Sequence, residues 1–359
     1  MTAYWTVFAI MFLLQFVNAN TQKGYLWRLI ISFIPLFIFA AFRDNFGLDY
    51  EAYMEMFETV HEYPGQYEDL RAEYGYLKLN EWLPTFRLLI ILTSAFTCAS
   101  YIYFFYKVIP ASYSWLAILL LFLSGDKSIF FMFSGIRNAI SISILIFTIP
   151  LLQKRRLLPF IMCMLLASLF HKTAFIYFPL AYFISSNRDM QRQEMQIWSG
   201  VFSFFFIFSH TAIMAPIENI TTMMFEDRYD TYIELIEQVG DNRGLLGRIS
   251  MLLTFVPLLC YTYKGSFSPQ ENIILRLGLM YTMAATMGAL NMRTTQHFIM
   301  FFIATTILIV SQNKQYILLK RLFVIFVIAY LSYAFFIVYM GNPAFPYETY
   351  ESTIFGIIE

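Results

Sequence analysis

Long apolar runs, separated by short polar segments, occupy most of this chain. Most of the runs approach the roughly 17 to 25 residues that an α-helix needs to cross the hydrocarbon core of a bilayer. The pattern therefore predicts a polytopic bundle of membrane helices. The runs lie near residues 3–18, 27–42, 87–109, 115–133, 136–152, 157–184, 197–215, 248–264, 271–290, 296–312 and 321–340.

The run at 157–184 is too long for one span and contains His171 and Lys172 near its middle. We interpret it as two short helices that meet at His171. Each half is only about 20 Å long at 1.5 Å per residue, whereas the hydrocarbon core is about 30 Å thick. The junction is therefore expected below the outer surface, and the whole chain is expected to have about 11–12 membrane segments, some of them short broken helices.

This division places basic residues mainly on one side of the membrane. The loops on that side hold thirteen Lys and Arg residues and three acidic residues, and Lys and Arg accumulate in cytoplasmic loops. The opposite, outer side then carries two larger loops, 43–86 and 216–247. The basic loops are 19–28, 107–114, 153–156, 185–196, 264–276 and 313–321.

Composition leads to the same class of protein. The 359 residues are 59% apolar and 13% charged, whereas about a quarter of the residues of a soluble globular chain are charged. Such a chain cannot cover itself with polar surface in water, so lipid must be most of its solvent. The net charge is zero, which argues against a nucleic-acid partner. We expect an all-α polytopic membrane helical bundle, with residues 1–359 forming a single integral membrane domain.

Five cationic or titratable side chains fall at the outer ends of membrane segments in this topology. Ionisable groups at membrane depth are costly unless they are paired or hydrated, and they are functional candidates by default. Their convergence on one face indicates an anion site, and guanidinium suits phosphate because its planar fork donates two hydrogen bonds. The five residues are Arg43, Arg137, His171, Arg248 and Arg293.

Each of these residues also has a structural interpretation. Arg43 and Arg248 fit interfacial anchors whose aliphatic stems lie along the bilayer surface. The same interpretation is open for Arg137 and Arg293, although it suits them less well. His171 fits a polar residue that fills a break between two helices.

Residues 50–62 have the spacing of an amphipathic helix lying on the outer surface, with Tyr50, Tyr53 and Phe57 on its apolar face. Asp49 precedes this helix directly, which is the position of an N-cap. A capping role and a catalytic role for its carboxylate are compatible, and both stay open.

Four short motifs occur in order along the chain. The first has the form R-x3-G-x-D-Y-x2-Y over 43–53, the second reads S-G-I-R-N at 134–138, the third reads F-H-K-T-A at 170–174, and the last is Pro-Tyr at 346–347. In this order they resemble the signature of the EpsG/Wzy-like polysaccharide polymerase family, which includes O-antigen polymerases of the Wzy type. Leu48 departs from the family pattern, in which Thr is common.

The resemblance implies a glycosyltransferase that polymerises lipid-linked oligosaccharide repeat units in O-antigen or exopolysaccharide synthesis. The donor would be a growing glycan on undecaprenyl diphosphate, and the acceptor would be the terminal sugar of a new undecaprenyl-diphosphate-linked repeat unit. A multi-pass protein of the cell inner (plasma) membrane is implied, with its active site facing the periplasm or outside. Membrane lipid, a chain-length regulator and a flippase are the further partners that the resemblance suggests.

This reaction gives the cationic residues a role. A departing diphosphate gathers negative charge, which preorganised cations stabilise. We expect Arg137, Arg248 and Arg293 to bind the diphosphate, with Arg43 in support.

The other candidates concern the acceptor and the sugars. The attacking hydroxyl needs a base, for which His171 is the first choice and Asp49 the second. Tyr50, Tyr53 and Tyr347 are expected to stack on sugar rings, since an aromatic face with a polar tip suits a sugar. We expect no metal ion and no cofactor.

Two alternative functions stay open. An O-antigen ligase would use the same donor with a lipid A core as acceptor, although the opening motif argues against it. A lipid-linked oligosaccharide flippase or transporter would need charge through the bundle in both leaflets, whereas the unusual charges here cluster on the outer side.

Overall fold

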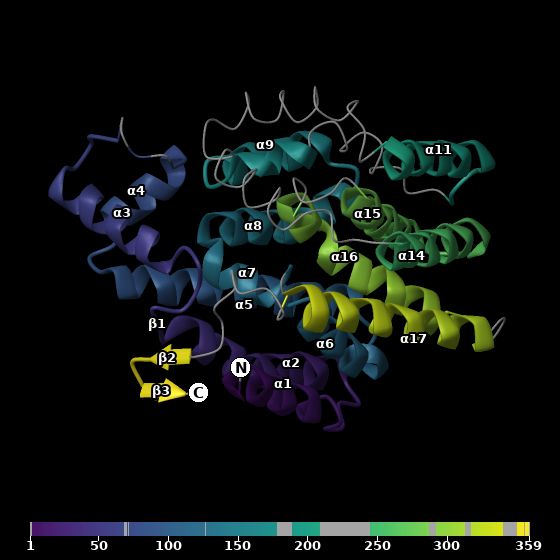
Figure 1. Cartoon of the computed structure of the whole chain (residues 1–359), viewed down its shortest axis with the longest axis horizontal. Coiled ribbons are helices and arrows are strands. Elements are labelled where there is room, and N and C mark those ends of the chain that lie inside the picture. Colours follow the sequence, from purple (N-terminus) through teal and green to yellow (C-terminus); the bar gives the residue numbers. More distant parts are fainter. Residues whose placement is uncertain are drawn as a thin grey trace. The chain divides into compact units, whose positions relative to one another are not determined.

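The computed structural model of the chain is a bundle of α-helices with one small β-sheet (Figure 1). The structure describes residues 2–67, 70, 72–125, 127–177, 189–208, 245–286, 292–312, 317–339, 350–354 and 356–358. Within these ranges, four helices are long and apolar enough to cross a membrane: Gln22–Ala41, Phe86–Val108, Ile136–Gln153 and Ile317–Phe336. Further apolar helices are shorter. The fold is the all-α polytopic membrane bundle that the apolar runs predict.

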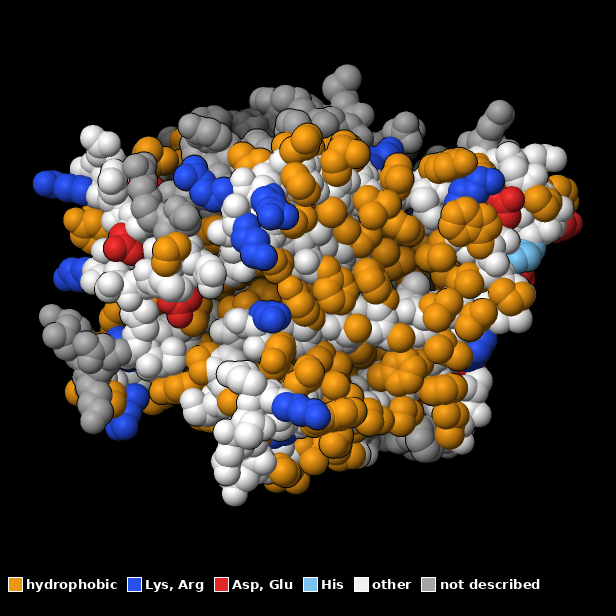
Figure 2. Space-filling model, turned by 180° about the vertical axis from the view of Figure 1, so that it is seen from behind, with side chains coloured by type: hydrophobic (Ala, Val, Ile, Leu, Met, Phe, Trp, Pro, Cys, Tyr) orange, Lys and Arg blue, Asp and Glu red, His pale blue; other side chains and the backbone are white. Residues whose placement is uncertain are grey.

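The surface carries many large apolar side chains, as Figure 2 shows over one face. Leu158 is 72% exposed, Leu318 is 67% exposed and Leu13 is 66% exposed. Wide apolar patches are rare on soluble monomers and mark a surface that meets another apolar phase. In this chain that phase is lipid.

Contacts divide the chain into two compact units. The first unit comprises Met1–Ser185 and Leu331–Glu359, and the second comprises Ser186–Tyr330. A single integral domain over the whole chain stays a prediction.

In the first unit, helices pack side by side in the pairs α1–α2, α2–α5, α5–α8 and α8–α9. Threonine side chains cap the N-termini of two of the long helices. The Thr21 hydroxyl accepts a hydrogen bond from Gly24 N–H, and the Thr85 hydroxyl accepts one from Leu88 N–H. The helices of this unit are α1 (Thr2–Leu14), α2 (Gln22–Ala41), α3 (Tyr50–Glu62), α4 (Tyr74–Trp82), α5 (Phe86–Val108), η1 (Ala111–Tyr113), α6 (Ser114–Leu123), α7 (Ile129–Ser134), α8 (Ile136–Gln153), α9 (Leu157–Ser168), η2 (Lys172–Ile176) and the π-helix η4 (Ala334–Tyr339).

The apolar run near 115–133, which we expected as one segment, is two helices. α6 ends at Leu123 and α7 begins at Ile129. Polar groups satisfy the carbonyl groups that the break leaves without helical partners: the Ser128 hydroxyl donates to Leu121 O over 2.7 Å, and the Tyr4 hydroxyl donates to Phe122 O over 2.6 Å. Irregular backbone is tolerated at membrane depth only where protein satisfies it in this way.

The long run at 157–184 is broken at the position that the sequence predicts. α9 ends at Ser168, and a 3-10 turn, η2, starts at Lys172 with His171 as its N-cap residue. The predicted junction at His171 is therefore confirmed. The second half of the run lies largely outside the described residues.

A three-stranded antiparallel sheet joins two distant parts of the first unit (Figure 1). Its strands are β1 (Arg43–Asp44), β2 (Tyr350–Ser352) and β3 (Gly356–Ile358), in the order β1-β2-β3. Arg43 pairs with Ser352 and Asp44 pairs with Glu351. The Tyr350 hydroxyl also donates to Phe39 O over 2.7 Å, so the late strands fasten the segment that follows α2.

In the second unit, α15 and α16 pack most closely. A Cβ atom added to Gly278 on α15 would lie only 2.2 Å from Thr305 Oγ1 on α16. Arg276 on α15 is fully buried and forms an ion pair with Glu194 on α11, with 2.6 Å between Nε and Oε1. The helices of this unit are α11 (Arg192–Phe208), α14 (Leu245–Lys264), α15 (Pro269–Thr286), α16 (Met292–Ser311) and most of α17 (Ile317–Tyr333).

Candidate functional site

The segment that carries the first motif is docked on the tip between α7 and α8. Gly47 has a φ of 116°, and a Cβ atom there would lie 2.9 Å from Phe133 O. Only glycine fits both that backbone conformation and that approach. The next residue, Leu48, donates its N–H to the Ser134 hydroxyl over 3.0 Å. The first motif therefore contacts the residue with which the second motif begins.

Arg43 is buried, with 1% of its surface exposed. Its guanidinium donates to the backbone carbonyls of Ala40 and Phe133 and lies 5.3 Å from the centroid of the Phe133 ring. These contacts tie the end of α2 to α7. A role in diphosphate binding for Arg43 stays a prediction.

A second arginine, Arg87 at the start of α5, supports the same segment. Its guanidinium forms an ion pair with Asp44 and donates to Arg43 O over 2.6 Å. The Tyr50 hydroxyl donates to the same Asp44 carboxylate over 3.1 Å. Burial raises the pKa of Tyr50, although the positive charge of Arg87 partly opposes the effect, so this hydroxyl is a donor at any working pH.

The amphipathic helix expected over 50–62 is present as α3, with the expected bounds. Asp49 occupies its N-cap position and accepts the Tyr53 N–H through its backbone oxygen, but its side chain makes no capping hydrogen bond. Tyr50 and Tyr53 are each 5% exposed. Both rings pack inside the protein in this state, edge-on to Phe86 and Tyr76 respectively, so their stacking on sugars stays a prediction.

Arg137, in the second motif, forms an ion pair with Glu73 at the start of α4. The distance between Nη1 and Oε2 is 2.7 Å, and each side chain is 11% exposed. The guanidinium carbon also lies 6.0 Å from the centroid of the Tyr53 ring. Glu73 was not among the residues that the sequence singled out.

Tyr76 is a buried residue of α4 whose ring packs edge-on against Tyr53. Burial raises the pKa of its hydroxyl, and the positive charges of Arg137 and Arg43 oppose that shift. Both positive charges act on this hydroxyl group, whereas a shared diphosphate site for Arg43 and Arg137 stays a prediction.

The third motif joins the same cluster through Glu73. The second carboxylate oxygen, Oε1, accepts the backbone N–H of Lys172 over 3.1 Å. Close by, the Gly75 N–H donates to Leu169 O over 2.9 Å. A Cβ atom on Gly75 would lie 2.7 Å from that oxygen, so the start of α4 lies directly against the tip that follows α9.

His171 is 6% exposed and is fixed by the second and third motifs together. Its Nδ1 accepts the Thr173 N–H over 3.2 Å and lies 2.7 Å from the Thr173 hydroxyl. That hydroxyl in turn lies 3.0 Å from Asn138 Oδ1. Thr173 therefore orients the imidazole ring through Nδ1.

Arg248 and Arg293 belong to the second unit. Arg248 is the fourth residue of α14 and Arg293 is the second residue of α16. α14, α15 and α16 follow one another through short connections and contact each other, so both arginines lie at the same end of that unit. Their convergence with the first unit stays a prediction, and Tyr347 lies outside the described residues.

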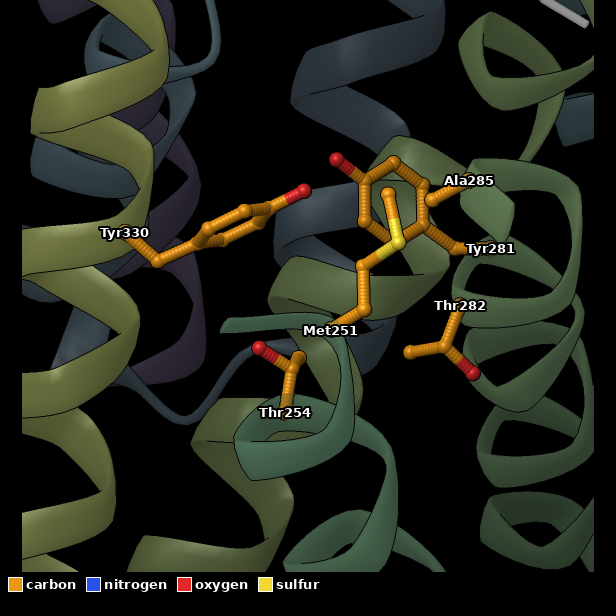
Figure 3. A pocket seen from close by; sticks show the side chains of 6 residues that line it. All are labelled: Met251, Thr254, Tyr281, Thr282, Ala285 and Tyr330. Atoms are coloured by element: carbon orange, nitrogen blue, oxygen red, sulfur yellow. The ribbon is translucent and has the colours of Figure 1, made fainter. Parts of the chain in front are cut away.

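Figure 3 shows a small cavity between α14, α15 and α17 in the second unit. Its volume is about 10 Å³, which leaves room for about one water molecule. The hydroxyl groups of Tyr281 and Tyr330 point toward each other there, with Met251 and Ala285 beside them. This cavity is too small to be the substrate site.

The cluster in the first unit therefore unites the first three motifs around Arg137, His171 and Glu73. The EpsG family matches residues 26–349 of the 359 residues, and the chain belongs to this family. No curated protein and no solved structure matched the chain. Membership gives the protein a polysaccharide-polymerase-like role in a membrane, with glycosyl transfer as its chemistry.

Proposed function

We propose that this protein polymerises lipid-linked oligosaccharide repeat units. The donor is a growing glycan on undecaprenyl diphosphate, and the acceptor is the terminal sugar of a new repeat unit on the same lipid. The observation that carries this proposal is the cluster in which Arg137 and the His171 tip meet beneath the first motif. Such a cluster supplies the cation and the hydrogen-bond donors that a departing diphosphate requires.

The reaction is a transfer at the anomeric carbon. A hydroxyl oxygen of the acceptor sugar forms a bond to that carbon, the bond from the carbon to the diphosphate oxygen breaks, and undecaprenyl diphosphate leaves with the electron pair. The hydroxyl proton passes to a base. Arg137, with its planar fork, is suited to bind the diphosphate in two hydrogen bonds.

The geometry adds detail to the two candidate bases. Thr173 contacts His171 through Nδ1, so we assign the contact with substrate to the other ring nitrogen, Nε2. Asp49, within the docked first motif, is already positioned at the start of α3 and is the second candidate.

The remaining parts of the proposal concern the setting of the reaction. In this proposal Arg137, Arg248 and Arg293 bind the diphosphate, Arg43 supports them, and Tyr50, Tyr53 and Tyr347 contact sugars. The protein acts in the inner membrane with its site open to the outside, beside a chain-length regulator and a flippase. It uses no metal ion, so a chelator leaves the reaction unchanged.

The test is reconstitution of the purified protein in liposomes with lipid-linked repeat units. Wild type is expected to give a ladder of products, whereas Arg137→Ala and His171→Ala give none. Arg137→Lys, which keeps the charge and loses the fork, is expected to be strongly impaired. Arg156→Ala is the matched control, because Arg156 is exposed beyond the other end of α8.

Each variant is checked for an unchanged melting temperature. Normal ladders from Arg137→Ala and His171→Ala would overturn the site. Transfer to a lipid A core without lengthening would identify a ligase, and movement of the substrate across the bilayer without lengthening would identify a flippase.

A further inference from the structure

Arg137 and Lys172 together form a binding site for an anion, and a carboxylate of the chain itself occupies it. Glu73 Oε2 accepts from Arg137 Nη1 over 2.7 Å. Glu73 Oε1 accepts from the Lys172 N–H over 3.1 Å. The two donors come from the second and third motifs, so the carboxylate bridges Arg137, which the proposed function assigns to the diphosphate, and the tip that carries His171.

Glu73 makes these contacts instead of serving its own helix. It is the N-cap residue of α4, with extended backbone angles (φ −73°, ψ 143°), and its side chain makes no capping hydrogen bond. A carboxylate at an N-cap is normally favourable because it accepts N–H groups of the first helical turn. The side chain of Glu73 is directed to the anion site instead.

A lipid diphosphate cannot use the same two donors while Glu73 occupies them. The two anions would also repel each other at such a distance. A diphosphate carries more negative charge than a carboxylate and can accept two parallel hydrogen bonds from guanidinium. It therefore has the stronger interaction with Arg137 and can displace the carboxylate.

The surrounding backbone allows this exchange without unfolding the site. The start of α4 is held at the tip by a backbone hydrogen bond from Gly75 N–H to Leu169 O, of 2.9 Å, which does not involve the Glu73 side chain. Rotation of that side chain is enough to release both donors. The side chains of Glu73 and Arg137 are each 11% exposed, so the ion pair is not fully enclosed by protein.

We propose that Glu73 is an internal stand-in for the substrate, which closes the diphosphate site until a polyprenyl diphosphate headgroup displaces it. This inference rests on the proposed function, because it takes the Arg137 site to be the diphosphate site. The apparent affinity of a ligand falls in proportion to the fraction of protein that is open to it. If Glu73 occupies the donors about nine-tenths of the time, its removal strengthens diphosphate binding about tenfold.

The test measures binding of farnesyl diphosphate, inorganic pyrophosphate and farnesol to the full chain in nanodiscs. Glu73→Gln removes the charge that competes with the ligand, and it is expected to bind farnesyl diphosphate about tenfold more tightly than wild type. Farnesol binding is expected to stay unchanged. Glu81→Gln is the matched control, because Glu81 is also an ion-paired carboxylate of α4, with 2.7 Å between Glu81 Oε2 and Lys78 Nζ.

A second variant keeps the test decisive if Glu73→Gln melts at a lower temperature. Glu73→Asp keeps the charge but is one methylene shorter, so it cannot bridge both donors, and it is also expected to bind farnesyl diphosphate more tightly. Equal tightening for inorganic pyrophosphate supports the proposal and shows that the headgroup suffices. Tightening for farnesyl diphosphate alone supports it and shows that the lipid tail contributes.

Two results would overturn the inference. Unchanged or weaker binding of farnesyl diphosphate by folded Glu73→Gln or Glu73→Asp would show that Glu73 only supports Arg137, while Arg137-dependent binding by wild type would leave the proposed function standing. If wild type does not bind farnesyl diphosphate, or binds it equally well after Arg137→Ala, the diphosphate site itself fails, and the inference fails with it.

Discussion

Replacing Gly75 by alanine tests whether the contact between α4 and the tip after α9 positions the site. The new Cβ atom would lie 2.7 Å from Leu169 O and 2.8 Å from Leu169 Cβ. Real Cβ atoms do not approach backbone that closely, so α4 must move away from the tip. The tip that carries His171 and Lys172 would then lose the backbone contact that positions it against α4.

Three contributions set the change in the free energy of unfolding, two of them destabilising and one stabilising. Overpacking costs roughly 1–3 kcal/mol, and loss of the hydrogen bond from Gly75 N–H to Leu169 O costs about 0.5–1.5 kcal/mol. Alanine gains about 1 kcal/mol over glycine within a helix. The net change is a loss of about 1–3 kcal/mol, because the steric term exceeds the gain in helix propensity.

The effect on activity is expected to exceed the effect on stability. A displacement of about 1 Å in a positioning contact can lower a rate about a hundredfold. Polymerisation by Gly75→Ala in liposomes should therefore fall about that far, while its melting temperature falls by a few degrees.

Gly200→Ala is the matched control for this substitution. Gly200 lies within α11, and a Cβ atom there meets nothing within 4 Å. Gly200→Ala should keep full activity and a melting temperature at or above that of wild type. If Gly75→Ala matches wild type in both ladder length and melting temperature, the contact does not position the site.

Two further predictions concern Thr173 and Tyr50. Thr173→Val removes the hydroxyl between Asn138 and His171 and should abolish most polymerisation, whereas Thr173→Ser keeps it; equal activity of the two variants would show that the hydroxyl does not orient the imidazole. Burial raises the pKa of Tyr50, so its contribution to stability is complete below its ordinary pKa of about 10 and is lost as pH rises through the higher pKa of the folded state. The melting temperature of wild type should therefore fall more steeply above about pH 10 than that of Tyr50→Phe, and parallel curves would contradict this.

The sequence pattern predicted correctly those elements that depend on residues close together in the chain. The helix over 50–62 follows from its apolar spacing, and α3 has those bounds. A polar pair, His171 and Lys172, inside an apolar run predicted a break, which the end of α9 and the start of η2 confirm.

Glu73 escaped prediction because its importance comes from distant partners. It stands in an outer loop with no periodic pattern, and its partners Arg137 and Lys172 lie 64 and 99 positions later in the chain. Arg87 was missed for a similar reason, because it looks like a basic residue at the start of an apolar helix. Its pairing with Asp44 depends on a fold that brings α5 beside the end of α2.

The pairing of β1 with β2 also has a consequence for the order in which the protein is made. Residues 43–44 leave the ribosome about 300 residues before 350–352, which at typical rates of synthesis is a delay of about 15–60 s. During that interval β1, which contains Arg43, has no partner strand. The nascent protein therefore completes the sheet that holds Arg43 only after nearly all of its described helices have been translated.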